Sequence, residues 1–398
     1  MTLLYINSWS IKDPLTISST LPNLRVLSDS SLIKEIIFIT PEYQEVKNIE
    51  IDIKKVKHFT IHLNLCTQPF LLKYICQELQ AKKVLKKISH QYKIDRILAR
   101  GSSAAGKALW VHKITKKPFY IESFEPHSEV MKESGVWKPY DPRYIVQALW
   151  EQKSIKKATG LLPVSNNYAK KLVNQYRREN KSIAMVPCTV NSDKFIFNFK
   201  KRLEIRQKLS IDNDAIVGIY VGKFGGIYYD KEAFEAFENA FKSIRNFHLI
   251  LLSPIKEDEL KHKISNFPKI DLTRFHHAFV PHKEIADYLS ASDFAYALIK
   301  SQPSTRYCSA IKIGEYWANG LPIIISKGVG DDSDIIEDTQ LGAIYKPQIN
   351  NHKECINKVL EISKQKDYRK KIVDLAIKYR NPQMIKNSYI KLGFVDEK

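Results

Sequence analysis

The 398-residue sequence lacks several features that would assign it to a class at once. It has no apolar run near the roughly 20 residues that a membrane-spanning helix needs. Its first residues, 1–14, show no basic segment ahead of an apolar one, so we expect a first β-strand there and not a signal peptide. Low-complexity segments and short-period repeats are also absent. These absences predict a globular protein, and the length suits two domains.

Cysteine is scarce and irregularly placed. The five cysteines stand at positions 66, 76, 188, 308 and 355, and no two of them form a Cys-x-x-Cys pair. Such an odd, widely spaced set argues against a zinc site and against a disulfide framework. We therefore expect a cytoplasmic protein with reduced cysteines and no bound metal.

Acidic residues are too few to balance the basic ones, which leaves a formal net charge of +20 at pH 7. This charge indicates an anionic partner, which is a nucleic acid, a phosphorylated ligand or an anionic membrane surface. The lysines are spread along the chain without a basic tail, a zinc-finger pattern or an RNP pattern, and this disfavours nucleic acid. One dense group, Lys82, Lys83, Lys86 and Lys87, lies in a helix predicted over residues 68–89. Its lysines form either a solvated helix face or a patch that binds a membrane surface.

The most informative stretch is 309–326, SAIKIGEYWANGLPIIIS. Ser309 is expected to cap a helix that ends at Asn319-Gly320, and the β-branched run after Pro322 predicts a fully buried strand. Glu315 is the only carboxylate in this largely apolar helix. It lies on a solvated face, forms a salt bridge that pairs two helices, or binds a ligand at the carboxyl edge of a parallel sheet.

A glycine-rich loop separates a strand predicted over Ile216–Val221 from a following helix. The loop begins at Gly222 and reads GKFGGIYY. Glycines let the backbone approach a ligand closely, free N–H groups and the helix dipole favour anions, and Lys223 adds a full positive charge. The combination of strand, glycine loop and helix indicates phosphate binding.

A second polar group follows the strand predicted over Phe119–Glu122, where Glu125 and His127 come just past the strand's carboxyl end. A lone histidine is usually structural, but Glu122 and Glu125 beside it at the strand's end make a functional role equally plausible, so both interpretations of His127 remain open. Strands and helices alternate throughout both halves of the chain, which predicts two doubly wound parallel sheets facing a cleft.

Together these motifs resemble the family-4 glycosyltransferases, which have the GT-B architecture. The resemblance is carried by residues 309–326, by the segments GVGD at 328–331 and IIE at 335–337 after them, and by FVPH at 279–282 before them. It is closest to the bacterial surface-polysaccharide and lipopolysaccharide branch. It implies two Rossmann-like domains, an N-terminal acceptor domain over 1–190 and a donor domain over 191–381. A C-terminal helix within 382–398 would cross back to the first domain.

The resemblance also implies an activity, the retaining transfer of a hexosyl or related group. The donor would be a nucleotide sugar, UDP- or GDP-linked, acting as substrate without any further cofactor and without metal. The acceptor would be a glycan or a lipid-linked molecule of the cell surface, reached at the inner membrane face.

The implied site residues follow from the same motifs. Positive charge and backbone N–H groups would neutralise the leaving diphosphate, Glu315 would accept hydrogen bonds from the ribose, and His127 would lie near the transfer centre. The catalytic set is His127, Lys223 and Glu315, and the donor-binding set is Gly222, Lys223, Gly225, Gly226, Lys231, Tyr307, Ser309, Lys312 and Glu315. Tyr307 stands where the family often has a glutamate that touches the donor sugar. This departure leaves an alternative, a catalytically silent GT-B protein that binds a nucleotide sugar or a protein partner.

Overall fold

The computed structural model describes residues 1–43, 51–63 and 70–397 and divides the chain into two compact units. Unit 1 comprises Met1–Lys132, Trp137–Pro187 and Gln383–Lys398, and unit 2 comprises Glu133–Val136 and Cys188–Pro382. The sequence predicts a division after residue 190, and the structure divides the chain after Pro187. The segment that begins at Gln383 returns to unit 1.

Unit 1 is built on a six-stranded sheet with the order β3-β2-β1-β4-β5-β6, in which all neighbouring strands are parallel. This is the strand order of the Rossmann fold, which binds ligands at the carboxyl ends of the strands where the order reverses. The strands are β1 (Thr2–Asn7), β2 (Glu35–Glu42), β3 (Val56–His62), β4 (Arg96–Arg100), β5 (Phe119–Phe124) and β6 (Gly160–Pro163).

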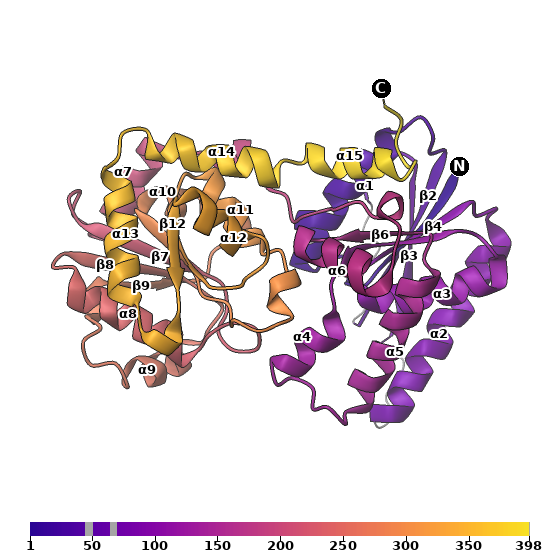
Figure 1. Cartoon of the computed structure of the whole chain (residues 1–398), viewed down its shortest axis with the longest axis horizontal. Coiled ribbons are helices and arrows are strands. Elements are labelled where there is room, and N and C mark those ends of the chain that lie inside the picture. The colour runs from indigo at the N-terminus through magenta and orange to yellow at the C-terminus, as the bar shows by residue number, and fades with distance from the viewer. Residues whose placement is uncertain (44–50, 64–69, 398) are drawn as a thin grey trace. The chain divides into compact units, whose positions relative to one another are not determined.

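Helices connect and cover these strands (Figure 1). They are α1 (Leu21–Asp29), α2 (Phe70–Gln91), α3 (Ser102–Thr115), α4 (His127–Glu133), α5 (Pro142–Lys157), α6 (Asn166–Tyr176) and the C-terminal α15 (Gln383–Lys391). Buried polar groups fix α15 to the sheet, because the Tyr389 hydroxyl donates to the Glu122 carboxylate of β5. The same carboxylate is paired with Arg100 of β4 at 2.7 Å.

Unit 2 repeats the design with the sheet order β12-β11-β10-β7-β8-β9, again parallel throughout. Read from β9, this is the same Rossmann order, and the order reverses between β7 and β10. The strands are β7 (Ile216–Val221), β8 (Phe247–Leu252), β9 (Phe275–Ala278), β10 (Phe294–Ala297), β11 (Ile323–Ser326) and β12 (Gly342–Tyr345).

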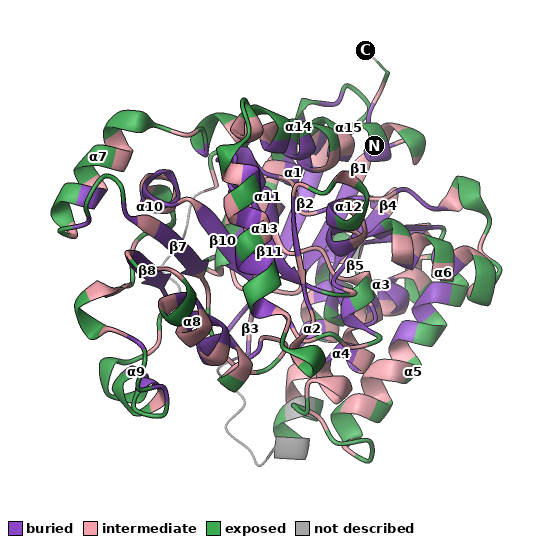
Figure 2. Cartoon of the chain, turned by 60° about the vertical axis from the view of Figure 1, so that its left-hand side comes forward, coloured by how far each residue is buried: buried purple, intermediate pink, exposed green. Residues whose placement is uncertain are grey.

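The helices of unit 2 leave the strands mostly buried, and most of these helices turn one face to solvent, whereas α10 and α11 contain no exposed residue (Figure 2). They are α7 (Phe199–Lys208), α8 (Lys231–Ser243), α9 (Glu257–Ile264), α10 (Ile285–Ala291), α11 (Ile311–Ala318), α12 (Asp332–Thr339), α13 (His352–Lys364) and α14 (Tyr368–Arg380).

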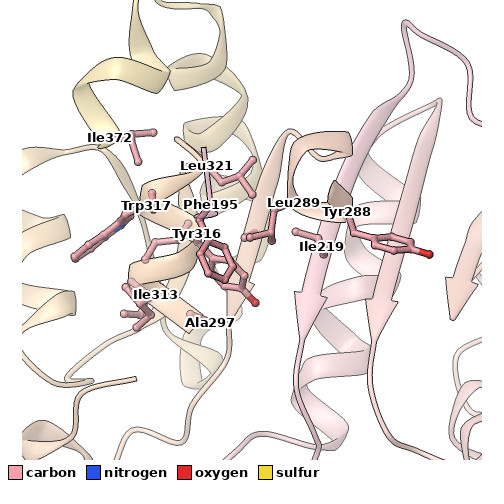
Figure 3. Packing of buried hydrophobic residues seen from close by; sticks show 14 of the residues in the cluster. Phe195, Ile219, Tyr288, Leu289, Ala297, Ile313, Tyr316, Trp317, Leu321 and Ile372 are labelled. Atoms are coloured by element: carbon pink, nitrogen blue, oxygen red, sulfur yellow. The ribbon is translucent and has the colours of Figure 1, made fainter. Parts of the chain in front are cut away.

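The predicted helix and strand around Glu315 are present as α11 and β11. Ile313, Tyr316 and Trp317 point from α11 into a core that also holds Leu321 (Figure 3). Along β11, alternate residues enter the two cores that lie on opposite faces of the sheet, as expected for a strand covered on both sides. Helix α11 is therefore firmly held against one face of the sheet.

The cysteines depart from the expectation at one position. Cys188, Cys308 and Cys355 are not in disulfides, but Cys76 on α2 is disulfide-bonded. The argument from spacing against disulfides is thus wrong for Cys76, because spacing along the chain does not show which segments meet in space.

Candidate functional site

The glycine loop of unit 2 leaves the carboxyl end of β7 with an open backbone. Gly222, Gly225 and Gly226 have φ values of +135°, +77° and +60°, a region that favours glycine. A side chain at Gly225 or Gly226 would meet nothing within 4 Å, so a ligand can approach the main chain there. Among the described residues, the amides of these two glycines donate to no backbone carbonyl. The loop thus offers N–H groups to an anion, as the sequence predicts.

Aromatic packing holds the loop in place. The ring of Phe224 stacks on that of Tyr220 with 5.0 Å between centroids. The Tyr220 hydroxyl donates to the carbonyl oxygen of Lys223 at 2.8 Å. These contacts anchor the loop from below, while the Lys223 side chain is exposed.

Lys312, in the first turn of α11, brings a buried cation under this loop. Its Nζ lies 2.8 Å from the position that a Cβ at Gly222 would occupy. It lies 4.3 Å and 4.8 Å from the ring centroids of Tyr228 and Tyr220, close enough for cation–π attraction. Within the described part of the chain, this Nζ has no hydrogen-bond partner.

Burial lowers the pKa of Lys312 to about 7, and the charge of Glu315 opposes that shift. A buried ammonium without a hydrogen bond is costly. An anion held by the loop would supply the missing partner, so this arrangement is suited to a phosphate group.

Glu315, one turn further along α11, is also buried, with 5% of its surface exposed. Its Oε1 lies 2.7 Å from Nε2 of His282, which stands in a short 3₁₀ helix after β9. This hydrogen bond raises the pKa of His282. The imidazole ring is packed edge-on to Phe195 at 5.7 Å. The solvated-face interpretation of Glu315 is therefore wrong, whereas the contact with His282 is of the kind that the salt-bridge interpretation predicts.

Ser309 does not cap α11 as predicted. The residue at the cap position is Ala310, and it makes no side-chain capping bond. The Ser309 hydroxyl instead accepts hydrogen bonds from the Cys188 amide, at 3.1 Å, and from Arg380. Arg380 also pairs with the buried carboxylate of Asp332. Ser309 thus connects the segment before α11 to Cys188, where the longer part of unit 2 begins, and to Arg380 at the end of α14.

The remaining predicted donor residues, Lys231 and Tyr307, lie close in sequence to the glycine loop and to α11, respectively. Lys231 begins α8 and pairs with Glu235 at 3.4 Å, on the largely exposed side of that helix. Tyr307 lies in the 3₁₀ helix Thr305–Tyr307, ahead of α11, and is half-buried. The structure therefore brings together Gly222, Lys312 and Glu315 most closely, and it gives Lys231 a partner on its own helix.

In unit 1, His127 is the first residue of α4, just beyond β5. Its ring meets Trp137 edge-on at 5.6 Å, and burial lowers its pKa, which favours the neutral imidazole. The next residue, Ser128, donates its amide and hydroxyl to Glu151 of α5 at 3.0 and 2.6 Å. Burial raises the pKa of Glu151 to about 7. Glu151 therefore fixes the start of α4, and hence the place of His127.

Sequence reasoning gave no role to His282, to Glu151 or to the rings of Tyr220 and Tyr228. His282 was within reach, because it belongs to the FVPH segment that carries the family resemblance. The partnership of Glu151 with Ser128 had no signal, since the two residues share no motif. No group of three or more His, Cys, Asp or Glu side chains in the described ranges could hold a metal ion. None of the helices in those ranges is long and apolar enough to cross a membrane.

Comparisons with known proteins place these features in context. Residues 201–379 match the model of the family Glycosyl transferases group 1. A comparison of the sequence with curated proteins gives no match. Among solved structures, sucrose-phosphate synthase from Thermosynechococcus elongatus is similar with a TM-score of 0.76 and 14% identity, over 99% of this chain and 98% of that one.

Two further structures are similar along their whole length. HepE of Anabaena, solved in complex with UDP, has a TM-score of 0.70 and 12% identity, over 98% of this chain and 99% of that one. WaaG, a glycosyltransferase involved in lipopolysaccharide biosynthesis, has a TM-score of 0.68 and 15% identity, with 100% of both chains covered. At such identities the likeness shows the fold, and the predicted fold class is confirmed.

Proposed function

We propose that this protein is a retaining glycosyltransferase, because residues 201–379 match the model of the family Glycosyl transferases group 1 and the chain has the GT-B fold. It moves a hexosyl or related group from a nucleotide sugar to a glycan or lipid-linked acceptor in cell-surface glycan synthesis. One observation carries the proposal: the buried Nζ of Lys312 lies beneath Gly222 and has no hydrogen-bond partner among the residues that the structure describes. Such a cation calls for an anion at the glycine loop, and a nucleotide diphosphate supplies one.

In this proposal the donor lies over the carboxyl ends of β7 and β10, where the strand order reverses. The amides of Gly225 and Gly226 and the charges of Lys312 and Lys223 stabilise the diphosphate as its bond to the sugar breaks. Glu315, held by His282 at 2.7 Å, accepts hydrogen bonds from the ribose hydroxyls. These groups neutralise the leaving group without a metal ion or any other cofactor.

The nucleotide is uridine- or guanosine-linked. The HepE structures contain UDP, and one contains UDP-glucose, which favours the uridine nucleotide for the present chain as well. The acceptor binds in unit 1, and His127, the first residue of α4, acts in the transfer step.

The test is release of nucleoside diphosphate from a panel of UDP-, GDP- and other nucleotide sugars, with nucleotide binding measured in parallel by calorimetry. We expect one donor to be turned over and its nucleotide to bind. A Lys242→Met protein serves as the matched control for Lys312→Met, because Lys242 is an exposed lysine of α8 paired with Glu238. Equal nucleotide binding by both variants would refute the donor site.

We also propose that the protein acts in the cytoplasm, at the inner face of the membrane. Along α2, Leu72, Ile75 and Leu79 expose 54%, 53% and 61% of their surface at helical spacing. The exposed Lys83, Lys86 and Lys87 follow on the same helix. Apolar side chains beside lysines suit an anionic lipid surface, where each lysine contributes about 1 kcal/mol.

Binding to vesicles that contain anionic lipid tests this proposal. Replacing Lys83, Lys86 and Lys87 by glutamine should weaken binding, and added salt should weaken it further, since charges are screened over about 8 Å at physiological ionic strength. The matched control replaces the exposed Lys364, Lys370 and Lys371 of unit 2 and changes the net charge equally. If both triple variants reduce vesicle binding to the same extent, the α2 lysines form only a solvated helix face.

The second candidate is a catalytically silent GT-B protein that binds a nucleotide sugar or a protein partner. Tyr307 favours it, because a tyrosine replaces the glutamate that the family often places against the donor sugar. Nucleotide binding without turnover of any donor, even with acceptor lipids present, would select this candidate. Restoring turnover with Tyr307→Glu would identify the missing contact.

A further inference from the structure

Unit 1 contains a cavity of about 210 Å³ that no part of the proposed donor chemistry uses. Its walls come from α2, α3 and α5, together with residues that follow β2 and β3. The side chains that matter here are Lys82, Glu78, Ser103, Lys107, Trp110 and Trp150. The cavity therefore opens where the carboxyl edge of the unit 1 sheet meets three helices.

Two indole rings give the cavity an aromatic lining. Trp110 extends from α3 and Trp150 from α5, and both are only partly buried. The second ring packs beside Gly106 of α3, where a Cβ would lie in ordinary van der Waals contact with the Trp150 ring, at 3.5–3.7 Å. The ring thus lies against the backbone of α3. A wide, rigid and apolar surface of this kind suits a flat-faced ring ligand.

The polar groups of the cavity carry an excess of positive charge. Nζ of Lys107 on α3 lies 3.1 Å from Oε1 of Glu78 on α2, so these two charges form an ion pair. Their side chains are 16% and 28% exposed, respectively. Lys82, one turn beyond Glu78 on α2, has no carboxylate partner among the described residues. One positive charge in the wall is therefore unbalanced and available to an anionic group.

From these observations we propose that the cavity binds a single sugar ring that bears an anionic group. The ring stacks on the indoles, its hydroxyls bond to the polar wall, and its carboxylate or phosphate pairs with Lys82. At 210 Å³ the space is smaller than the roughly 300–1,000 Å³ of pockets for drug-sized ligands, which fits one ring. The inference rests on the proposed function, since it identifies this ring as a unit of the acceptor.

The test follows the intrinsic fluorescence of the whole chain, whose five tryptophans include the two of the cavity. The probes are glucuronate, glucose 6-phosphate, glucose and inorganic phosphate. We expect both acidic sugars to change the fluorescence in a saturable way. Glucose should bind with roughly tenfold lower affinity, because it lacks the charged group and so loses one charge-assisted hydrogen bond. Phosphate alone should give no saturation. Equal binding of inorganic phosphate would overturn the proposal, because the sugar ring would then contribute nothing.

Two adjacent lysines supply matched variants. Lys82→Ala should lower affinity for the acidic sugars roughly tenfold and leave glucose unaffected. Lys83→Ala, which removes an exposed lysine outside the cavity, should change neither. Ser103→Phe should abolish all sugar binding, because it fills the cavity from an exposed position in the first turn of α3. Sugar binding by Ser103→Phe that matches the unmodified protein would overturn the proposal.

Nucleotide binding, measured by calorimetry on the same samples, separates this inference from the proposed function. Ser103→Phe should bind nucleotide normally, since the cavity and Lys312 belong to different units. Loss of sugar binding with intact nucleotide binding therefore supports the cavity. A protein that binds nucleotide but no acidic sugar refutes the cavity and leaves the donor site standing.

Discussion

The ammonium of Lys312 lies 2.8 Å from the place where a side chain at Gly222 would begin. The absence of a side chain at one residue and the charge of the other are thus parts of one arrangement, although 90 positions separate them in the sequence (312 − 222). Any change to either residue should alter what the glycine loop can bind.

Replacing Lys312 by methionine should greatly reduce turnover. The substitution keeps an unbranched side chain that is shorter by one atom and removes the charge that faces the leaving diphosphate. Loss of one such electrostatic contact lowers turnover by a factor on the order of 10²–10³. Steady-state kinetics with the preferred donor measure the effect, and Lys242→Met should behave as the unmodified protein does. Turnover within a factor of about two of the unmodified protein would contradict the role of Lys312.

Nucleotide affinity should fall as the pH rises above about 7. Burial lowers the pKa of Lys312 to about 7 in the free protein, whereas a bound diphosphate favours the charged amine and raises that pKa. Binding above pH 7 must therefore take up a proton, and the dissociation constant should increase by up to about tenfold per pH unit. Calorimetry in buffers with different ionisation enthalpies counts this proton. Proton uptake that persists unchanged in Lys312→Met would assign it to another group.

The lowered pKa of Lys312 also affects stability, but whereas nucleotide affinity should fall with rising pH, the stability of the free protein should increase. Between pH 7 and the ordinary value of 10.5, the unfolded chain holds a proton on Lys312 that the folded chain has lost. The free energy of unfolding attributable to this residue therefore rises with pH across that window. Lys312→Met should be stabilised relative to the unmodified protein at pH 7, and the difference should shrink towards pH 10. Thermal unfolding of both proteins across this range checks the direction.

Glu315→Gln should weaken nucleotide binding more than it weakens the fold. The substitution retains the shape but replaces one acceptor oxygen by an amide donor, so a charged hydrogen bond to the ribose worth about 1.5–3 kcal/mol is lost. Calorimetry gives the affinity, and Glu337→Gln, an exposed residue of α12, is the matched control. Unchanged affinity in Glu315→Gln would leave its bond to His282 as a purely structural contact.

His127→Ala should lower turnover far more than donor affinity. His127 belongs to unit 1, whereas the donor-binding residues belong to unit 2, so nucleotide binding should not depend on it. A fall in turnover with an unchanged nucleotide dissociation constant is the signature of a group that acts at the transfer step. Normal turnover would assign the imidazole to packing against Trp137.

Activity should survive a chelator. In the described ranges no cluster of ligating side chains could hold a metal, and cationic groups surround the proposed diphosphate position. Turnover measured with and without EDTA, after dialysis, should agree within error. A strict requirement for manganese or magnesium would show that the lysine-based account of the leaving group is incomplete.

The sequence predicts most of the fold, because hydrophobic period and turn residues are local signals. The glycine loop and α11 follow from such signals, and both are in place. Partnerships between distant residues have no local signal. Only the structure therefore shows three such contacts: the hydrogen bond between Glu315 and His282, the hydrogen bond from Arg380 to Ser309, and the disulfide at Cys76. The error at Ser309 has the same origin, because a serine before a helix predicts a cap unless a distant arginine engages it.

The return of α15 to unit 1 sets an order for assembly on the ribosome. Every residue of unit 2 is synthesised before Tyr389 emerges, so unit 2 can complete its core while unit 1 still lacks a helix. Until then Glu122 and Arg100, already joined by Tyr5, lack the hydroxyl of Tyr389. The unit that begins translation is thus the last to be finished, and a nascent chain stalled before residue 383 would present an incomplete first unit to chaperones.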